Sequence, residues 1–170
     1  LDKPTFFSTN NLRDTIAFTS WKGKYNLDNE YIEAQNINYI HIADALIQPD
    51  SGKMVITRQA RIRPFENATI AVNNRHILHS ASISIENSQR YSGSALYDYI
   101  DENNEIQQIK FSEITADTST TTAKGYIPVS QKFMLSSAFS FTGDVSLSAR
   151  QDLLSLTGAA GIVHNCNGLK

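Results

Sequence analysis

Apolar or aromatic side chains recur at every second position in segment after segment of this chain. The pairs that show the period are Ile40 and Ile42, Ile83 and Ile85, Tyr97 and Tyr99, Phe139 and Phe141, Val145 and Leu147, and Leu154 and Leu156. A period of two is typical of a strand with one face buried and the other in water. The best helical candidate, residues 131–138, is short, and its apolar residues fit one strand face equally well. The sequence therefore predicts an all-β protein.

Residues that favour turns stand between these runs. The predicted turns are Asp50-Ser51-Gly52-Lys53, Asn73-Asn74, Asp101-Glu102-Asn103-Asn104 and Thr142-Gly143-Asp144. Asn, Asp and Gly accept backbone conformations that other residues avoid. Their spacing predicts many strands of about 5 to 7 residues. The Thr and Ser tract within residues 116–123 predicts an exposed loop that could divide the chain into two sheets or lobes.

A short unit recurs in which an apolar or aromatic residue and a polar residue precede a glycine and then a strand. Its glycines are Gly23, Gly93, Gly143 and Gly158. A repeated glycine in this setting predicts a bulge or a corner where a Cβ would clash. Stacked units of this kind predict an elongated β-jelly roll, with a right-handed parallel β-helix or solenoid as the alternative.

The segment from Ile40 to Ile56 combines an Ala-Asp-x-Ala run with an aspartate-glycine-lysine turn. It resembles the repeat of the OstA-like family, the periplasmic lipopolysaccharide-transport proteins, and the units near Gly143 resemble that family's other recurring element. The chain is also similar to segments of large uncharacterised envelope proteins of Gram-negative anaerobes. No catalytic residue transfers from either resemblance.

The OstA-like resemblance implies an open jelly roll whose apolar interior holds lipid or lipopolysaccharide acyl chains. Its ends would pair with other β domains strand to strand, in the periplasm or elsewhere in the envelope of a Gram-negative bacterium. The ligand-binding residues that we expect along the interior are Ile40, Ile42, Val55, Ile83, Ile85, Phe141 and Val145.

Length and charge exclude several other classes of protein. The 170 residues suit a single domain, residues 1–170, and the start at Leu1 leads us to expect a fragment or module of a longer chain. The 15 Lys and Arg residues and 17 Asp and Glu residues form no runs, so we expect no nucleic-acid partner. No apolar stretch approaches the roughly 20 residues of a spanning helix, so we expect no transmembrane segment.

Histidine spacing predicts no metal site and no cofactor. His76 and His79 are three residues apart, which on a strand sends their rings to opposite faces. The same parity separates His41 from Asp44. His164 and Cys166 share a face of an extended segment, but zinc needs two further ligands, and none is close in sequence.

Catalytic motifs are missing from the sequence as well. There is no Gly-x-Ser-x-Gly elbow and no glycine-rich phosphate loop, so we expect a protein that is not an enzyme. The alternative function is a β-helical carbohydrate-binding, carbohydrate-active or adhesive domain. Its candidate surface site is Tyr97, Asp98, Tyr99 and Asp101. Glycoside hydrolysis needs two carboxylates beside the scissile bond, and an Asp between tyrosines could line a sugar-binding cleft.

Overall fold

The computed structural model describes residues 5–7, 16–58, 61–117 and 120–163. Within these residues the chain is almost entirely β, and the two complete 3-10 turns are η1 (Asp50–Gly52) and η3 (Val129–Gln131). Its strands are β1 (Thr5–Phe7), β2 (Ala17–Thr19), β3 (Lys22–Asn26), β4 (Tyr31–Gln35), β5 (Ile40–Ile42), β6 (Ala45–Gln48), β7 (Met54–Thr57), β8 (Arg61–Ile62), β9 (Phe65–Val72), β10 (His76–Asn87), β11 (Arg90–Ile100), β12 (Ile106–Asp117), β13 (Thr120–Ile127), β14 (Met134–Ser136), β15 (Phe139–Ser148) and β16 (Ser155–Ile162).

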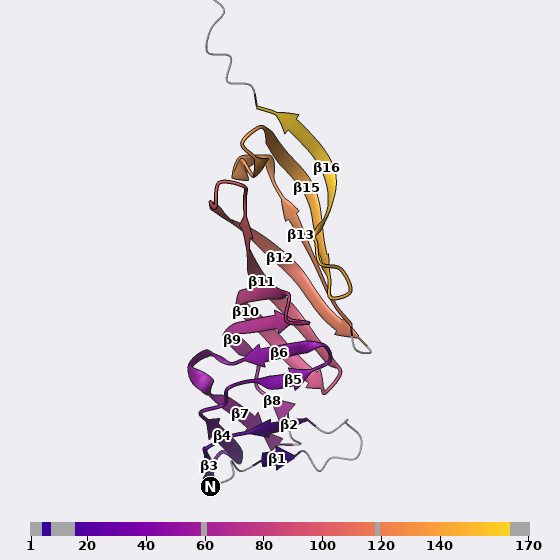
Figure 1. Cartoon of the computed structure of the whole chain (residues 1–170). Helices are drawn as coiled ribbons and strands as arrows, with labels where there is room; N and C mark the ends of the chain where they lie inside the picture. Colours follow the sequence, from indigo (N-terminus) through magenta and orange to yellow (C-terminus); the bar gives the residue numbers. More distant parts are fainter. Residues whose placement is uncertain (1–4, 8–15, 59–60, 118–119, 164–170) are drawn as a thin grey trace, which may run out of the picture.

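One large sheet forms most of the molecule (Figure 1). Its ten strands follow the order β14-β15-β13-β12-β11-β10-β9-β6-β5, with β16 also paired to β15. A four-stranded sheet, β3-β4-β7-β8, and the β1-β2 pair lie at the N-terminal end. Every pairing in the described part of the chain is antiparallel. The all-β, jelly-roll-like prediction is confirmed, and the parallel β-helix alternative is wrong.

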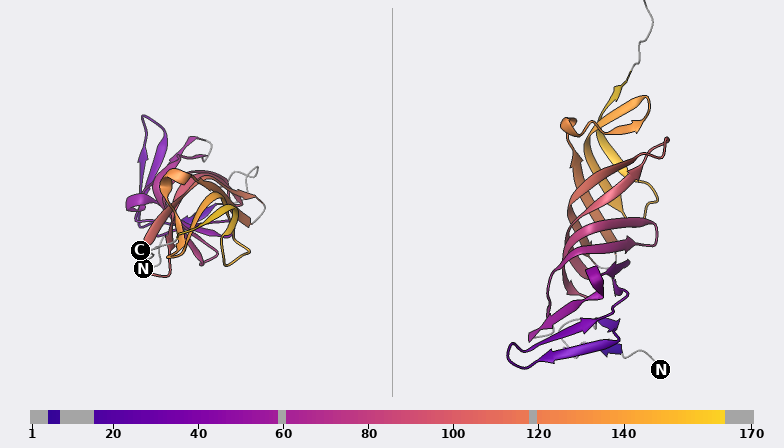
Figure 2. Two further views of the ribbon diagram at one scale, coloured as in Figure 1. Left: turned by 90° about the horizontal axis from the view of Figure 1, so that it is seen from above. Right: turned by 90° about the vertical axis from the view of Figure 1, so that its left-hand side faces the viewer.

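The large sheet curls into an elongated half-barrel (Figure 2), and side chains on its concave face join the buried core. Burial alternates along its strands as the period of two predicts: Thr121, Ala123 and Ile127 on β13 are buried, and the residues between them that face outward are exposed. A single apolar cluster runs through the interior, from Phe18 near the N-terminus to Leu147 near the C-terminus. The sheet therefore forms both walls of its own core.

Three of the four glycines of the recurring unit, Gly93, Gly143 and Gly158, stand where neighbouring strands approach closely; a Cβ on the fourth, Gly23, would meet only the ring of Phe6 at 3.3 Å, so the corner prediction is wrong there. A Cβ on Gly93, Gly125, Gly143 or Gly158 would lie within 3.0 Å of backbone atoms of the adjacent strand. Gly143 has a φ of 144°, and it pairs with Gly158 across β15 and β16. Register shifts in the ladders between β9 and β13 add further twist. Glycine corners and bulges together allow the sheet to curl.

Two sequence predictions in this region are wrong. Thr142-Gly143-Asp144 is not a turn but the middle of β15, because a glycine that relieves close strand approach has the same local signature as a turn glycine. The tract within residues 116–123 is not a long loop: β12 extends to Asp117, and β13 begins at Thr120. Because β12 and β13 are neighbours in one sheet, the tract does not divide the chain into lobes. Threonine favours strands through its branched Cβ, and Thr121 is fully buried.

The other predicted turns are confirmed. Residues 50–53 form a tight turn through η1, with Ser51 and Gly52 in the left-handed region. This turn carries the chain from β6 in the large sheet to β7 in the small one. In residues 131–138 the strand interpretation holds for β14, and no α-helix forms there; only Gln131 belongs to a helical turn, η3.

Replacing Gly143 by alanine should destabilise the fold by about 2 kcal/mol, because the strained φ and the clash with Gly158 both oppose a side chain. Gly161→Ala is the matched control in the neighbouring strand. Its Cβ would meet only the side-chain oxygen of Ser140, which can rotate, so the change should stay within about 0.5 kcal/mol. Urea unfolding followed by circular dichroism measures both. Equal stability of the two variants would contradict the corner assignment.

Candidate functional site: an uncovered strand edge

The seven residues expected to line an acyl-chain interior do not form an open trough. Six of them belong to the packed core, each at most 8% exposed: Ile40, Ile42, Ile83, Ile85, Phe141 and Val145. Val55 is half-buried, lies on the opposite face of β7 from the buried Met54, and is not part of that core. The side chains of the protein itself fill the interior at these positions.

The histidines occupy separate environments, as parity predicts. The His76 ring is buried, and its Nε2 lies 2.8 Å from the carbonyl oxygen of Gln151. His79 is on the opposite face of β10, with its Nε2 3.0 Å from Oδ1 of Asp98. Among the described residues no three His, Cys, Asp or Glu side chains gather as a metal site would require. His164 and Cys166 lie outside the described residues.

The alternative sugar site is not assembled in one place. Tyr97 and Tyr99 pack against the core, whereas Asp98 between them is exposed on the other face of β11. The Asp101 carboxylate is almost fully buried and accepts hydrogen bonds from the backbone N–H groups of Asn103 (2.8 Å) and Glu105 (2.9 Å). Asp101 therefore stabilises its own turn, and the four residues do not line a common cleft.

Asp44 carries the longest-range polar contact that the structure describes. Thr121 donates its hydroxyl to Oδ1 of Asp44 (2.5 Å) and its backbone N–H to both carboxylate oxygens (3.1 and 3.0 Å). The Tyr91 hydroxyl lies 2.8 Å from Oγ1 of Thr121 and completes the chain. These bonds join the turn between β5 and β6 to β13, 77 residues further along. Local sequence patterns contain no signal for a contact at this separation.

Burial keeps the Tyr91 end of this cluster protonated over a wide pH range. Burial raises the pKa of the Tyr91 phenol well above its ordinary value, while the hydrogen bond with Thr121 lowers it and the charge of Asp44 raises it, both by less. The phenol therefore stays protonated and remains able to donate to Thr121. The cluster has no exposed nucleophile, and its side chains bond to one another, so its geometry suits a structural tie rather than catalysis.

A second set of polar contacts lies near the first. The Asn73 side chain donates to the carbonyl oxygen of Ala149 (3.0 Å), and Arg75 forms an ion pair with Asp152. With the contact between His76 and Gln151, these bonds join the turn between β9 and β10 to the loop between β15 and β16. These polar contacts between a turn and a loop therefore hold the two walls of the half-barrel together along this side.

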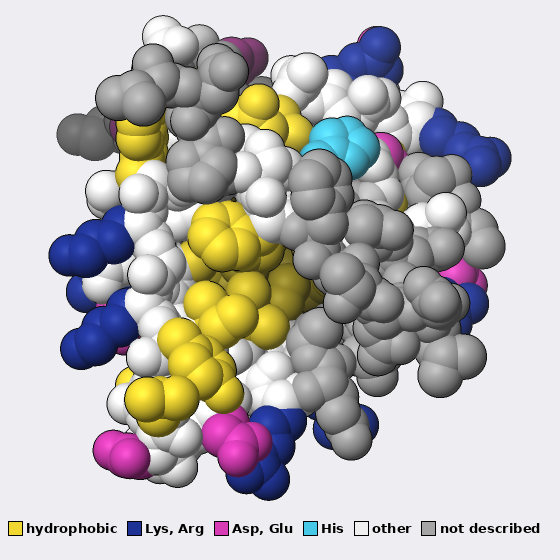
Figure 3. Space-filling view, turned by 90° about the horizontal axis from the view of Figure 1, so that it is seen from below, with side chains coloured by type: hydrophobic (Ala, Val, Ile, Leu, Met, Phe, Trp, Pro, Cys, Tyr) yellow, Lys and Arg dark blue, Asp and Glu magenta, His cyan; other side chains and the backbone are white. Residues whose placement is uncertain are grey.

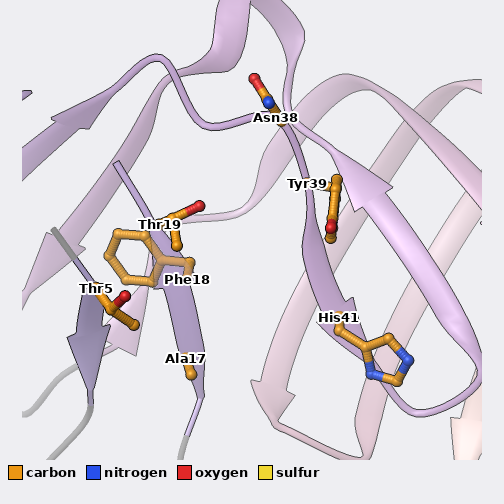
Figure 4. Close-up of a pocket in the computed structure, with 7 residues that line it drawn as sticks. All are labelled: Thr5, Ala17, Phe18, Thr19, Asn38, Tyr39 and His41. Carbon is orange, nitrogen blue, oxygen red and sulfur yellow. The ribbon is translucent and has the colours of Figure 1, made fainter. Parts of the chain in front are cut away.

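A shallow hollow of about 220 Å³ opens at the N-terminal end. Hydrophobic side chains gather on this end face (Figure 3), and Figure 4 shows Phe18 near Thr5 and Thr19 on one side of the hollow, with Tyr39 and His41 on the other. Ala17 and Asn38 complete its lining. Among these described residues there is no charged pair and no base beside a nucleophile, so the hollow selects no particular chemistry.

The C-terminal end presents a different feature, an uncovered strand edge. In the described part of the chain, β15 is the only strand hydrogen-bonded to β16. The ladder between them runs from Ser155 to Ile162 without a register shift. The sequence of β16 is Ser-Leu-Thr-Gly-Ala-Ala-Gly-Ile. It contains no charged residue and no proline, and every residue except Leu156 is exposed. Natural proteins usually protect such an edge with charges, prolines or bulges, because it can pair with another chain.

A groove of about 450 Å³ lies beside this edge. Its apolar walls include Val129 after β13, Met134 on β14 and Phe141 on β15, and Ala160 of β16 closes one side. Among the described residues that line it, Lys132 is the one that is basic. The alternating pairs Phe139 and Phe141, and Val145 and Leu147, predict a half-buried strand here, but nothing in the local pattern marks β16 as the end of the sheet.

The chain matches no protein-family model, no curated protein and no solved structure. Among the described residues there is no helix with the length and hydropathy needed for a membrane span.

Replacing Thr121 by valine should destabilise the fold by about 2 to 3 kcal/mol, because it leaves the buried Tyr91 hydroxyl without its partner. The neighbouring Thr122 faces outward, so Thr122→Val is the matched control and should change stability by less than about 0.5 kcal/mol. Urea unfolding compares the two variants.

Adding Tyr91→Phe to Thr121→Val should cost less than the sum of the two single changes, because the unpaired hydroxyl is then removed. Strict additivity in this double-mutant cycle would show that the two side chains do not act as a unit.

Proposed function

We propose that this chain is a non-catalytic module of a bacterial cell envelope that builds a larger β assembly by pairing the edge of β16 with a strand of another β domain. The observation that carries the proposal is the free edge itself, which is eight residues long, regular and uncharged. Strand addition at such an edge draws its affinity from main-chain hydrogen bonds. The envelope location rests on the resemblance of residues 40–56 to the OstA-like repeat.

The surroundings of the edge favour an assembly role over a catalytic one. Thr121 and Asp101 are buried and engaged in structural contacts, as is the partly buried Asp44, and among the described residues Nδ1 of His76 is the one buried side-chain atom without a hydrogen bond. Ile162 remains 65% exposed at the end of β16. Burying this side chain against an added strand would contribute favourable free energy in addition to the backbone bonds.

A lysine at Ala159 tests the proposal. Ala159 is exposed in the middle of β16, so Ala159→Lys should leave the fold intact and should weaken association by roughly tenfold or more, which corresponds to about 1.4 kcal/mol. Ser84→Lys, on the exposed face of the interior strand β10, introduces the same charge away from the edge.

Sedimentation velocity over a concentration range, with and without a labelled peptide of sequence Ser155–Ile162, measures association of the two variants and the wild type. We expect the wild type and Ser84→Lys to pair with the peptide or with themselves and Ala159→Lys to fail. Equal behaviour of the two lysine variants, or a wild type that pairs with nothing, would refute the assembly function.

A second candidate function is the binding of a lipid acyl chain in the groove beside β16. The observation that favours it is the groove's apolar lining, which includes Phe141, one of the residues expected to contact such a ligand, with Lys132 available for an anionic head group. The groove lies at one end of the molecule, in contrast to the packed interior around Ile40 and Ile83.

Native mass spectrometry of protein purified from a Gram-negative host tests this candidate. We expect a lipid-mass adduct on the wild type that is lost in Val129→Asp, because the new charge would stand at the groove wall. Leu153→Asp is the matched control, since both side chains are at least 75% exposed and only Val129 lines the groove. A wild type that carries no adduct after gentle extraction would rule the candidate out.

A further inference from the structure

The other strand edges of the two larger sheets are all protected within the described residues. β5 has only three residues, its two isoleucines are fully buried, and β2 lies against it. β3 has lysines at positions 22 and 24. β8 consists of Arg61 and Ile62 alone. Lysine and arginine, short length and covering elements are the usual means of preventing edge pairing.

The edge strand β14 is protected by side chains instead. Gln107 donates from its amide to the carbonyl oxygen of Met134 (2.7 Å) and accepts from the Met134 N–H (2.8 Å). The Tyr99 hydroxyl donates to the carbonyl oxygen of Leu135 (3.2 Å). Among the described edges of these two sheets, that of β16 is the exception, and none of the protected edges is a suitable partner for it.

The hydrogen-bond pattern identifies which backbone groups of β16 face outward. The Val163 N–H donates to the carbonyl oxygen of Ala138 (2.8 Å), which continues the register of the ladder with β15. Because bonded and non-bonded pairs alternate in an antiparallel ladder, the odd-numbered residues of β16 bond to β15. The outward N–H and C=O groups therefore belong to Leu156, Gly158, Ala160 and Ile162.

We propose that the partner of β16 is β16 of a second copy of this chain, in antiparallel orientation about a two-fold axis at Ala159. This inference rests on the proposed strand-addition function and names its partner. In this register all four outward residues pair: Leu156 with Ile162 of the second copy, and Gly158 with Ala160 of the second copy. The edge is thus complementary to itself, as an isologous contact requires.

Charge and burial favour the same arrangement. Neither copy brings a charged side chain into the pairing, so no desolvation cost arises of the kind that Lys22 and Lys24 of β3 would impose. Leu156 already packs against the core, and the even-numbered residues of β16 share its face. Pairing places the exposed Ile162 beside Leu156 of the second copy, so the two apolar interiors become continuous.

The assembly closes as a dimer. A symmetric contact uses the same edge of both copies, so no free edge of this kind remains to extend the assembly. An open chain of many copies would instead require β16 to pair with a different edge of the next copy, and those edges are short, covered, bonded or charged.

Disulfide trapping tests the inference on the whole chain, with Cys166 replaced by serine in every variant. At the two-fold axis Ala159 opposes itself in a non-bonded pair with a Cα separation of about 4.5 Å, which a disulfide spans. Ala160→Cys is the matched control, because residue 160 is equally exposed. Residue 160 of the second copy lies two residues out of register with it, so the Cα separation exceeds the roughly 7 Å that a disulfide allows.

Under mild oxidation we expect Ala159→Cys to form at least about tenfold more covalent dimer than Ala160→Cys. Light scattering should show that the oxidised Ala159→Cys protein and the wild type at high concentration stop at twice the monomer mass.

Equal cross-linking of the two cysteine variants, or a mass that grows past the dimer with concentration, would overturn the symmetric pairing. If the β16 peptide still binds the wild type and does not bind Ala159→Lys, the proposed strand addition stands. If the peptide fails to bind as well, both proposals fall together.

Discussion

The fold depends on one constraint: a single antiparallel sheet has to cover its own apolar face. No helix layer and no second sheet of comparable size is present in the described residues to cover the concave side. The sheet therefore curls, and curling forces neighbouring backbones together at positions such as Gly143 and Gly158, where a Cβ cannot fit. Curvature, the placement of the glycines and the continuous core are consequences of the same requirement.

Curling alone leaves the two walls free to separate on the open side, and the polar contacts between turns prevent this. Asp44 joins the start of the large sheet to Thr121 on β13, and Asn73 and Arg75 join its middle to the loop before β16. These residues look like ordinary turn or strand residues in the sequence. Their importance comes from the pairing of elements that are 75 or more residues apart.

In the part of the chain that the structure describes, all but one of the edges of the two larger sheets are protected, so the molecule is well suited to associate through the remaining one. The side chains of Gln107 and Tyr99 satisfy the edge of β14, and lysines occupy β3, whereas β16 has neither kind of protection. The packed interior makes the groove near Phe141 a better location for an apolar ligand than the length of the roll. Both proposed functions therefore place activity at the C-terminal end.

Local pattern determined a large part of this protein. The period of two predicted the strands and sent His76 and His79 to opposite faces, and the recurring glycine unit predicted the corners at Gly93, Gly143 and Gly158. These features depend only on residues within one strand, where side chains alternate and a glycine lacks a Cβ. The errors at Thr142-Gly143-Asp144 and in residues 116–123 have the same cause, because a glycine or threonine gives the same local sequence pattern in a turn and in a strand.

Only the tertiary structure decided which edges are free and which polar groups meet. Whether β16 ends the sheet depends on the order of all the strands, and the contact of Asp44 with Thr121 depends on how far the sheet has curled. No window of adjacent residues contains that information. The sequence determined what each strand can bury, and the assembled sheet determined what each strand leaves exposed.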